Sequence, residues 1–262
     1  MVLPLYDHSP FRLPHRPIVT WALIAANVLV FLIEFVVPDS DAFVLTFGAI
    51  PAAVVGESTN AGELSPVLTL ITYQFLHADF MHIFGNMIFL WVFGDDVEEA
   101  LGRGRFLLFY LSCGVIGALA FVASGIHAET PLIGASGSIS GVVIAYLMLR
   151  PCAPVTVLTF GFLPMRLSAY WVVGFFIVLQ FVNLGSASAS EVAYWCHVGG
   201  MGAGALLFPL LRRPGVRLFE CIRRPDELDA AKDPEIAAAA EPRAGGRRSP
   251  SGTGNDRHGP WG

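Results

Sequence analysis

The sequence predicts an all-α fold, a polytopic membrane protein built as a bundle of six transmembrane helices. Its 262 residues are 54% hydrophobic and 14% charged, and their mean hydropathy is +0.61. One soluble core of this length would not bury so much apolar surface. The apolar residues are grouped into six spans, and the cations fall in alternate connections between these spans. Composition, span count and charge placement therefore predict the same fold class.

A helix needs about 20 residues to cross the hydrocarbon core of a bilayer, and two spans have that length. They are residues 17–37 and 106–126. The first span is too long for the apolar part of a cleaved signal peptide, and no small-residue cleavage site follows it. The other four spans are interrupted by His, Asn, Gly or Ser, and they are residues 80–94, 136–149, 167–183 and 193–211.

The positions of Lys and Arg predict the orientation of the bundle. No cation occurs between Arg16 and Arg103, although this interval contains a long polar stretch, residues 38–65. Cations recur between the fourth and fifth spans, at Arg150 and Arg166, and again after the sixth. The connections after the first, third and fifth spans contain none. By the positive-inside rule, both ends of a six-helix chain then face the cytoplasm.

Three parts are predicted along the chain: a cytoplasmic N-terminal segment, residues 1–16, a membrane domain, residues 17–212, and a cytoplasmic tail, residues 213–262. The tail is charged and then rich in Ala, Gly, Pro and Ser. Such a composition cannot bury a core, so we expect the tail to be disordered.

The four cysteines show neither metal nor disulfide spacing, and we interpret them as small membrane residues: Cys113, Cys152, Cys196 and Cys221.

Polar side chains inside membrane spans are costly and by default mark function. The first cluster of them contains His77, His82 and Asn86, the last two being four residues apart and so on one helix face. The second cluster is residues 134–141 and the third is residues 195–204. Both of these clusters are rich in glycine, and they contain a serine and a histidine within the fourth and sixth spans.

The second and third clusters each contain a G-x-x-x-G pattern, at residues 137–141 and 200–204. Such small faces let membrane helices approach closely. Packing one face on the other would bring the Ser136 hydroxyl within reach of the His197 imidazole. A serine with an adjacent base is the minimum for nucleophilic acyl chemistry, because the base must take the hydroxyl proton.

The shortness of the fourth span places Ser136 below the membrane surface. A helix over residues 136–149 rises only about 21 Å, against a hydrocarbon core of about 30 Å. With its inner end fixed by Arg150, its outer end must open into a water-filled cavity. The Ser136 backbone N–H at the helix start, together with His82 and Asn86, could then stabilise an oxyanion.

These motifs resemble those of the rhomboid family of intramembrane serine proteases, in its six-helix bacterial form. The matching patterns are H-x-x-x-N at residues 82–86, G-x-S-G at residues 134–137 and H-x-x-G-x-x-x-G at residues 197–204, and the resemblance covers roughly residues 15–212. It implies that Ser136 is the nucleophile and His197 the general base, with His82 and Asn86 assisting the oxyanion.

The resemblance also implies the partners, which are transmembrane segments of membrane-protein substrates and the lipid bilayer. The membrane is expected to be a bacterial plasma membrane, and the reaction is expected to need no cofactor and no metal. It makes residues 38–73 the membrane-embedded first loop and Glu98 a structural residue. Residues 167–183 become a mobile helix beside which substrate enters, with residues 184–190 as a cap. Oligomeric state is left open.

One position departs from the family pattern. Many rhomboids have a tyrosine four residues after the nucleophile, where its ring supports the catalytic histidine, and here that position is Ser140. We therefore expect His197 to be held by a hydroxyl or by another ring. His77 is expected to be structural, at the base of the first loop. Cys196 adjoins His197 but points another way on a helix, so a Cys–His nucleophile is not expected.

Two alternatives from other classes stay open. One is a proteolytically inactive rhomboid-like protein that binds membrane clients, against which the intact Ser136 and His197 argue. The other is a polytopic haem or metal protein that uses His77, His82 and His197, but these histidines lack companions in ligand spacing and no H-E-x-x-H occurs. Nucleic acid is not an expected partner, because the basic residues do not gather on one patch.

Overall fold

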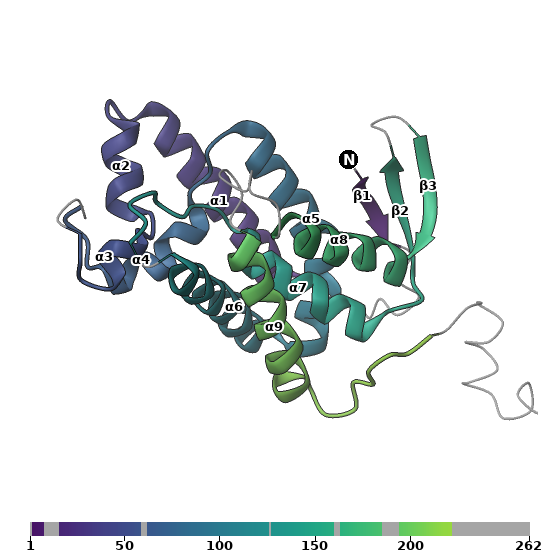
Figure 1. The fold of residues 1–262 in the computed structure, drawn as a ribbon. Helices are drawn as coiled ribbons and strands as arrows, with labels where there is room; N and C mark the ends of the chain where they lie inside the picture. The colour runs from purple at the N-terminus through teal and green to yellow at the C-terminus, as the bar shows by residue number, and fades with distance from the viewer. Residues whose placement is uncertain are drawn as a thin grey trace, which may run out of the picture. The chain divides into compact units, whose positions relative to one another are not determined.

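The structure of the chain is a computed structural model (Figure 1). It describes residues 2–7, 16–58, 62–125, 127–159, 163–184 and 194–221. Most of these residues are helical, and they belong to one unit that comprises residues 1–223. The predicted tail is described only as far as residue 221, and the expected cap lies almost wholly outside the described residues, since only residue 184 of it is included.

Among the described residues, six helices of 14 to 22 residues make up the bundle, as the sequence predicts. Within the described ranges, α1, α6 and α9 are long and apolar enough to cross a membrane. Helix α5 is counted as a further candidate span together with residues 66–75, and the chain is bent by 83° between these two parts. Helices α7 and α8 are apolar but shorter. The bounds are α1 Ile18–Val36, α5 Phe80–Leu101, α6 Arg103–Ser124, α7 Ser136–Leu149, α8 Ala169–Leu184 and α9 Tyr194–Leu211.

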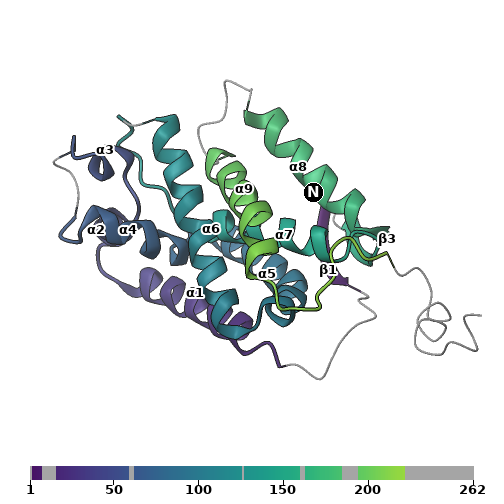
Figure 2. The ribbon, with the colours of Figure 1, turned by 90° about the horizontal axis from the view of Figure 1, so that it is seen from below.

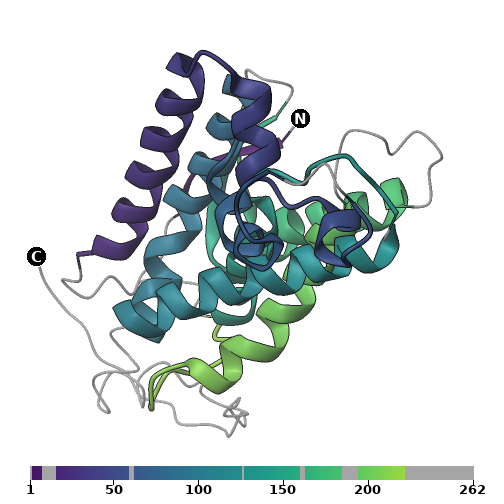
Figure 3. The ribbon, with the colours of Figure 1, turned by 90° about the vertical axis from the view of Figure 1, so that its left-hand side faces the viewer.

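Helix α7 lies at the centre of the bundle. It packs against α5, α6, α8 and α9, and nearly all of its residues after the first are buried. Figure 2 shows α9 between α6 and α8, and Figure 3 shows α1, in purple, running beside α5. A helix that is apolar all round is expected to be buried. The bounds of α7 are those predicted for the fourth span, so its 14 residues leave it short of a full crossing.

Glu98 on α5 fixes the start of α1. The first backbone N–H groups of a helix have no acceptor within the helix. The Glu98 carboxylate accepts hydrogen bonds from the backbone N–H of Val19 at 3.2 Å, from that of Thr20 at 2.7 Å and from the Thr20 hydroxyl at 2.8 Å. A carboxylate at this end also interacts favourably with the helix dipole. This fully buried side chain therefore joins two helices, which is a structural role.

The predicted first loop is folded into short helices. They are α2 Ser40–Phe47, α3 Pro51–Val54, α4 Pro66–Thr72 and the 3-10 helix η1 Tyr73–Phe75. Helices α3 and α4 both begin at a proline, a residue suited to the first helical position. The Tyr73 hydroxyl donates to the Gly114 carbonyl on α6 at 2.7 Å. This bond attaches the loop to the bundle at α6.

A three-stranded antiparallel sheet was not anticipated within this helical fold. Its order is β1 Val2–Asp7, β2 Pro154–Thr159 and β3 Leu163–Ser168, and it packs against α5 and α8 (Figure 1). The predicted fifth span therefore starts two residues late, at Ala169, because residues 167 and 168 belong to β3. Val155 and Val157 flank Thr156, and this alternation of apolar and polar residues was a strand signal available in the sequence. Both valines are buried in the structure.

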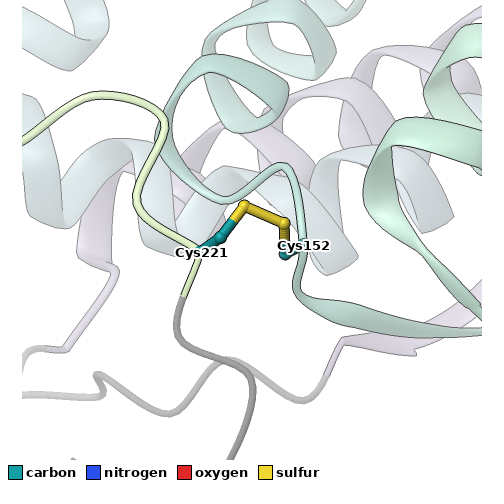
Figure 4. The surroundings of a disulfide bond; sticks show 2 residues. All are labelled: Cys152 and Cys221. Atoms are coloured by element: carbon teal, nitrogen blue, oxygen red, sulfur yellow. A yellow bond between two sulfur atoms is a disulfide. The ribbon is translucent and has the colours of Figure 1, made fainter.

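Two of the four cysteines form a disulfide, so the interpretation of all four as small membrane residues is wrong. Cys152, just after α7, is bonded to Cys221 (Figure 4). The two cysteines are 69 residues apart in the chain, so no short sequence motif predicts the bond. Cys113 and Cys196 are free and buried within α6 and α9, as that interpretation predicts.

Candidate active site

Ser136 is the first residue of α7, and the backbone before it is tightly constrained. Ala49 and Leu132 exchange hydrogen bonds as an isolated bridge, and the Gly134 N–H donates to the Tyr73 carbonyl at 2.9 Å. Gly134 has φ +117°, a conformation that favours glycine. Ser136 is partly exposed although the residues after it are buried. Its backbone N–H has no acceptor within the helix and is available to a ligand.

The two glycine faces pack on each other, as the sequence predicts. A Cβ atom built on Gly200 would lie 2.0 Å from the carbonyl oxygen of Gly137. A Cβ atom on Gly204 would lie 2.6 Å from the carbonyl oxygen of Gly141. Neither position can hold a side chain without moving a helix backbone. The absence of side chains therefore sets the distance between α7 and α9.

This packing brings Ser136 and His197 together. The Ser136 Oγ lies 2.8 Å from the Nε2 of His197, although 61 residues separate them in the chain. The His197 side chain is almost fully buried. Serine can donate its proton only to an unprotonated Nε2, so the neutral ring that fits this bond has its proton on Nδ1. The pair has the geometry of a nucleophile with its general base.

The other ring nitrogen of His197 contacts a residue that sequence analysis missed. Its Nδ1 lies 2.8 Å from the Oε1 of Gln180, which is buried on α8. A strongly polar amide inside an apolar span was the signal that could have identified it. The Tyr194 ring meets the His197 ring edge-on, with centroids 6.2 Å apart. The expected ring contact therefore exists.

Ser140 does not hold His197, so a hydroxyl at this position does not replace the family tyrosine. Its Oγ is buried and makes no hydrogen bond within the part of the chain that the structure describes. Its neighbour Ser138 donates instead to the Oε1 of Gln74 at 2.7 Å, away from His197. The role expected for a hydroxyl is filled by the amide of Gln180.

His82 lies over the segment that enters α7. A Cβ atom built on Gly134 would be 2.8 Å from both Cε1 and Nε2 of the His82 ring. The backbone N–H of His82 is capped by Asp79, whose Oδ1 accepts at 2.9 Å at the start of α5. The same Cβ position is 3.8 Å from the Ser136 Oγ, so the imidazole of His82 stands close to Ser136.

Asn86 follows His82 by one helical turn and is buried. Its side-chain nitrogen makes no hydrogen bond to any residue in the described ranges. A buried amide donor without a partner is uncommon in folded proteins. The structure thus leaves this donor free for a ligand, while no direct bond from Asn86 to Ser136 is present among the described residues.

His77 packs on His82 and does not join the Ser136–His197 pair. The two rings meet edge-on with centroids 5.1 Å apart. His77 is 1% exposed, and neither of its ring nitrogens has a partner among the described residues. Within the same ranges, no group of three or more His, Cys, Asp or Glu side chains could hold a metal ion.

Comparison with known proteins places the chain among relatives of one kind. The family model described as Rhomboid domain matches residues 65–214. Rhomboid protease GluP of Bacillus subtilis is 31% identical over 216 residues, which cover 79% of this chain and 38% of that protein. The human presenilin-associated rhomboid-like protein, mitochondrial, is 35% identical over 147 residues, covering 55% of this chain and 35% of the relative.

A third relative is Rhomboid protein 1, mitochondrial, of Saccharomyces cerevisiae, which is 25% identical over 210 residues, covering 77% of this chain and 56% of the relative. The chain thus spans less than two thirds of the length of each of these relatives. The matched region includes Ser136 and His197 together with five of the six bundle helices in full, and only α1 lies outside it. On this match and on the helical membrane bundle, the chain belongs to the rhomboid family.

Proposed function

We propose that the chain is an intramembrane serine endopeptidase that cleaves transmembrane segments of membrane proteins. Ser136 is the nucleophile and His197 is the general base. The observation that carries the proposal is the 2.8 Å separation of Ser136 Oγ and His197 Nε2 at the buried contact of α7 and α9. The relative GluP, which is named a protease, supports it.

The first half of the reaction forms an acyl-enzyme. A substrate segment enters from the bilayer beside α8 and unwinds, because the hydrogen bonds of an intact helix shield its peptide bonds. His197 Nε2 takes the proton from Ser136 Oγ while the oxygen attacks the substrate carbonyl carbon. The resulting imidazolium then donates that proton to the leaving amine, the C–N bond breaks, and an ester to Ser136 remains.

The second half of the reaction uses water. His197 Nε2 takes a proton from a water molecule, and the hydroxide attacks the ester carbon. The C–O bond to Ser136 breaks, and the serine oxygen recovers a proton from His197. The enzyme is thereby regenerated, and one peptide bond has been exchanged for a carboxyl group and an amine.

The negative charge on the carbonyl oxygen needs donors that are in place before the reaction. The backbone N–H of Ser136 is one, and the dipole of α7 reinforces it. The unpartnered side-chain nitrogen of Asn86 and the imidazole of His82 supply the others. His82 stands over Gly134 and Asn86 is buried one turn further along α5, so both lie on the side of α5 that faces the nucleophile segment.

Replacing Asn86 by alanine is expected to lower the turnover of a transmembrane substrate by about 10²–10³-fold, the effect of removing one well-aimed oxyanion donor of about 2.7–4 kcal/mol. The folded state should survive, because the Asn86 nitrogen makes no hydrogen bond that the substitution would break. Steady-state kinetics in liposomes measure the effect, with the melting temperature as a control. Turnover equal to that of the wild type would show that Asn86 does not stabilise the oxyanion.

Covalent labelling by a fluorophosphonate tests the proposal as a whole. This small probe reacts far faster with a serine whose proton an adjacent base removes than with other hydroxyls, so we expect the main adduct on Ser136, located by mass spectrometry. Ser136→Ala should abolish the labelling, and inactivation of substrate cleavage should parallel it. A folded protein that takes up no probe would indicate the other candidate, an inactive rhomboid-like protein that binds membrane clients.

We further propose that residues 17–212 are the membrane domain, that both termini are cytoplasmic, and that the membrane is the plasma membrane. The distribution of cations supports this orientation. The Cys152–Cys221 disulfide lies beside Arg150, at the proposed cytoplasmic end of α7. Thiols are usually kept reduced in the cytosol, so a disulfide on the cytoplasmic side of the membrane would be exposed to reduction.

A further inference from the structure

We propose that Gln180 is the positioning residue of the general base: its amide oxygen holds His197 in the tautomer that can take the proton of Ser136. This inference rests on the proposed roles of Ser136 and His197. It concerns a residue on α8, outside the two helices that carry the reacting pair.

The need for such a residue follows from the chemistry of the imidazole. A neutral ring has one proton, on Nδ1 or on Nε2, and only the Nδ1–H form leaves Nε2 free to act as a base. The Nδ1–H group must then find an acceptor. His197 is 9% exposed, and leaving a buried donor without a partner costs about 1–3 kcal/mol. An unsatisfied Nδ1–H would therefore favour the wrong tautomer.

Gln180 supplies that acceptor. Its Oε1 lies 2.8 Å from Nδ1, and its side chain is 7% exposed. In the opposite tautomer, Nδ1 would be an acceptor facing the Gln180 oxygen, so the amide would have to turn over to donate to it, and Nε2–H would compete with the serine proton. The contact with Oε1 facing Nδ1 therefore fits the productive form and not the unproductive one. The ring is also fixed in rotation, because both of its nitrogens are bonded to different helices.

Other candidates for this role are not placed to fill it. Ser140 makes no hydrogen bond in the described part of the chain, and Tyr194 offers the ring only an edge contact. No carboxylate in the described ranges is hydrogen-bonded to His197. In serine hydrolases with three catalytic residues, a carboxylate both orients the histidine and stabilises its positive form. A neutral amide supplies the first of these effects and not the second.

The position of Gln180 on its helix supports a specific role. Apart from Gln180 and Asn183, helix α8 is strongly apolar, and its residues Phe175, Val178 and Phe181 are largely exposed on the surface that would face lipid. An amide in such a helix is costly unless it is bonded within the protein. Gln180 is buried toward α9, and its oxygen is bonded to the catalytic base.

The test compares three variants of the full-length protein in detergent. Gln180→Leu removes the acceptor with little change in volume, and Gln180→Glu keeps an acceptor at the same reach. Asn183→Leu is the matched control, since it removes an amide from the same helix that donates to its own helix at Leu179. The measurements are the inactivation rate by a fluorophosphonate, resolved into its maximal rate and its half-saturating concentration, and the ¹⁵N side-chain NMR signals of His197.

We expect Gln180→Leu to lower the maximal inactivation rate by about 10²-fold, the lower range of what general base catalysis contributes, with the half-saturating concentration unchanged. The His197 signals, assigned by difference from His197→Ala, should shift from the Nδ1–H form toward the Nε2–H form. Gln180→Glu should restore the rate to within about threefold, and Asn183→Leu should match the wild type. A role in packing alone predicts the reverse order, with leucine tolerated and a buried glutamate harmful.

Wild-type labelling and an unchanged tautomer in Gln180→Leu would overturn the inference. The NMR signals separate this result from a failure of the proposed function. If the wild-type protein did not react with the probe at all, the proposed protease would be wrong, yet the tautomer of His197 with and without Gln180 would still decide whether the amide sets it.

Discussion

Alanine in place of Ser136 is expected to abolish cleavage of a transmembrane substrate reconstituted with the protein in liposomes, and His197→Ala should do the same. Each substitution removes one half of the pair that forms the acyl-enzyme, and such pairs act as a unit. We expect turnover to fall by about 10⁴-fold or more, equivalent to about 5 kcal/mol of transition-state stabilisation. The double variant should be no slower than either single variant.

Matched controls separate loss of chemistry from loss of fold. Ser140→Ala removes a hydroxyl from the same helix that makes no hydrogen bond within the described residues, so its activity should stay near that of the wild type. His127→Ala removes an exposed imidazole that pairs with Glu57 at 2.6 Å and should also be active. Residual cleavage by Ser136→Ala above the background of a denatured sample would contradict the proposed nucleophile.

Gly200→Ala is expected to destabilise the protein and to inactivate it. The new Cβ atom would lie 2.0 Å from the carbonyl oxygen of Gly137, so α9 must move away from α7. Overpacking of this kind typically costs about 1–3 kcal/mol of folding free energy and occasionally more. The same movement separates His197 from Ser136, and a misplacement of about 1 Å can cost about 10²-fold in rate.

Gly202→Ala provides the control on the same helix. Beyond the backbone of its own helix, no atom of the described residues lies within 4 Å of a Cβ built on Gly202, and alanine is the better helix former by about 0.5–1 kcal/mol. Unfolding in mixed detergent micelles and turnover in liposomes should therefore distinguish the two variants, with Gly202→Ala stable and active. Equal stability and activity of Gly200→Ala would show that the close approach of the two helices is not required.

Much of the bundle could be predicted from the sequence because each membrane span is a local pattern. The span over residues 136–149 has the bounds of α7, since its ends are marked by Pro-rich and charged sequence on either side. The contact of α7 with α9 could be predicted as well, because glycines four residues apart specify a smooth face wherever they occur. Ser136 and His197 then followed from their positions beside these faces.

The features that sequence analysis missed depend on pairings between distant segments. Strand β1 lies at the start of the chain and pairs with β2 about 150 residues later, and no local pattern specifies such a partner. The Cys152–Cys221 bond is of the same kind. Gln180 was visible as a polar residue in a span, yet its partner on α9 could be identified only from coordinates, because α8 has no glycine face to indicate its neighbour.

Where α7 and α9 approach each other, a Cβ atom on Gly200 or Gly204 would meet main-chain atoms of α7, so the main chain lies on both sides of this contact. A substitution at this contact cannot be accommodated by a change of rotamer. Side-chain variation elsewhere in the bundle therefore leaves the relative placement of Ser136 and His197 unchanged. Selection for new substrates would then act on surfaces remote from that junction, such as the apolar exterior of α8, while the spacing of the reacting atoms stays constant.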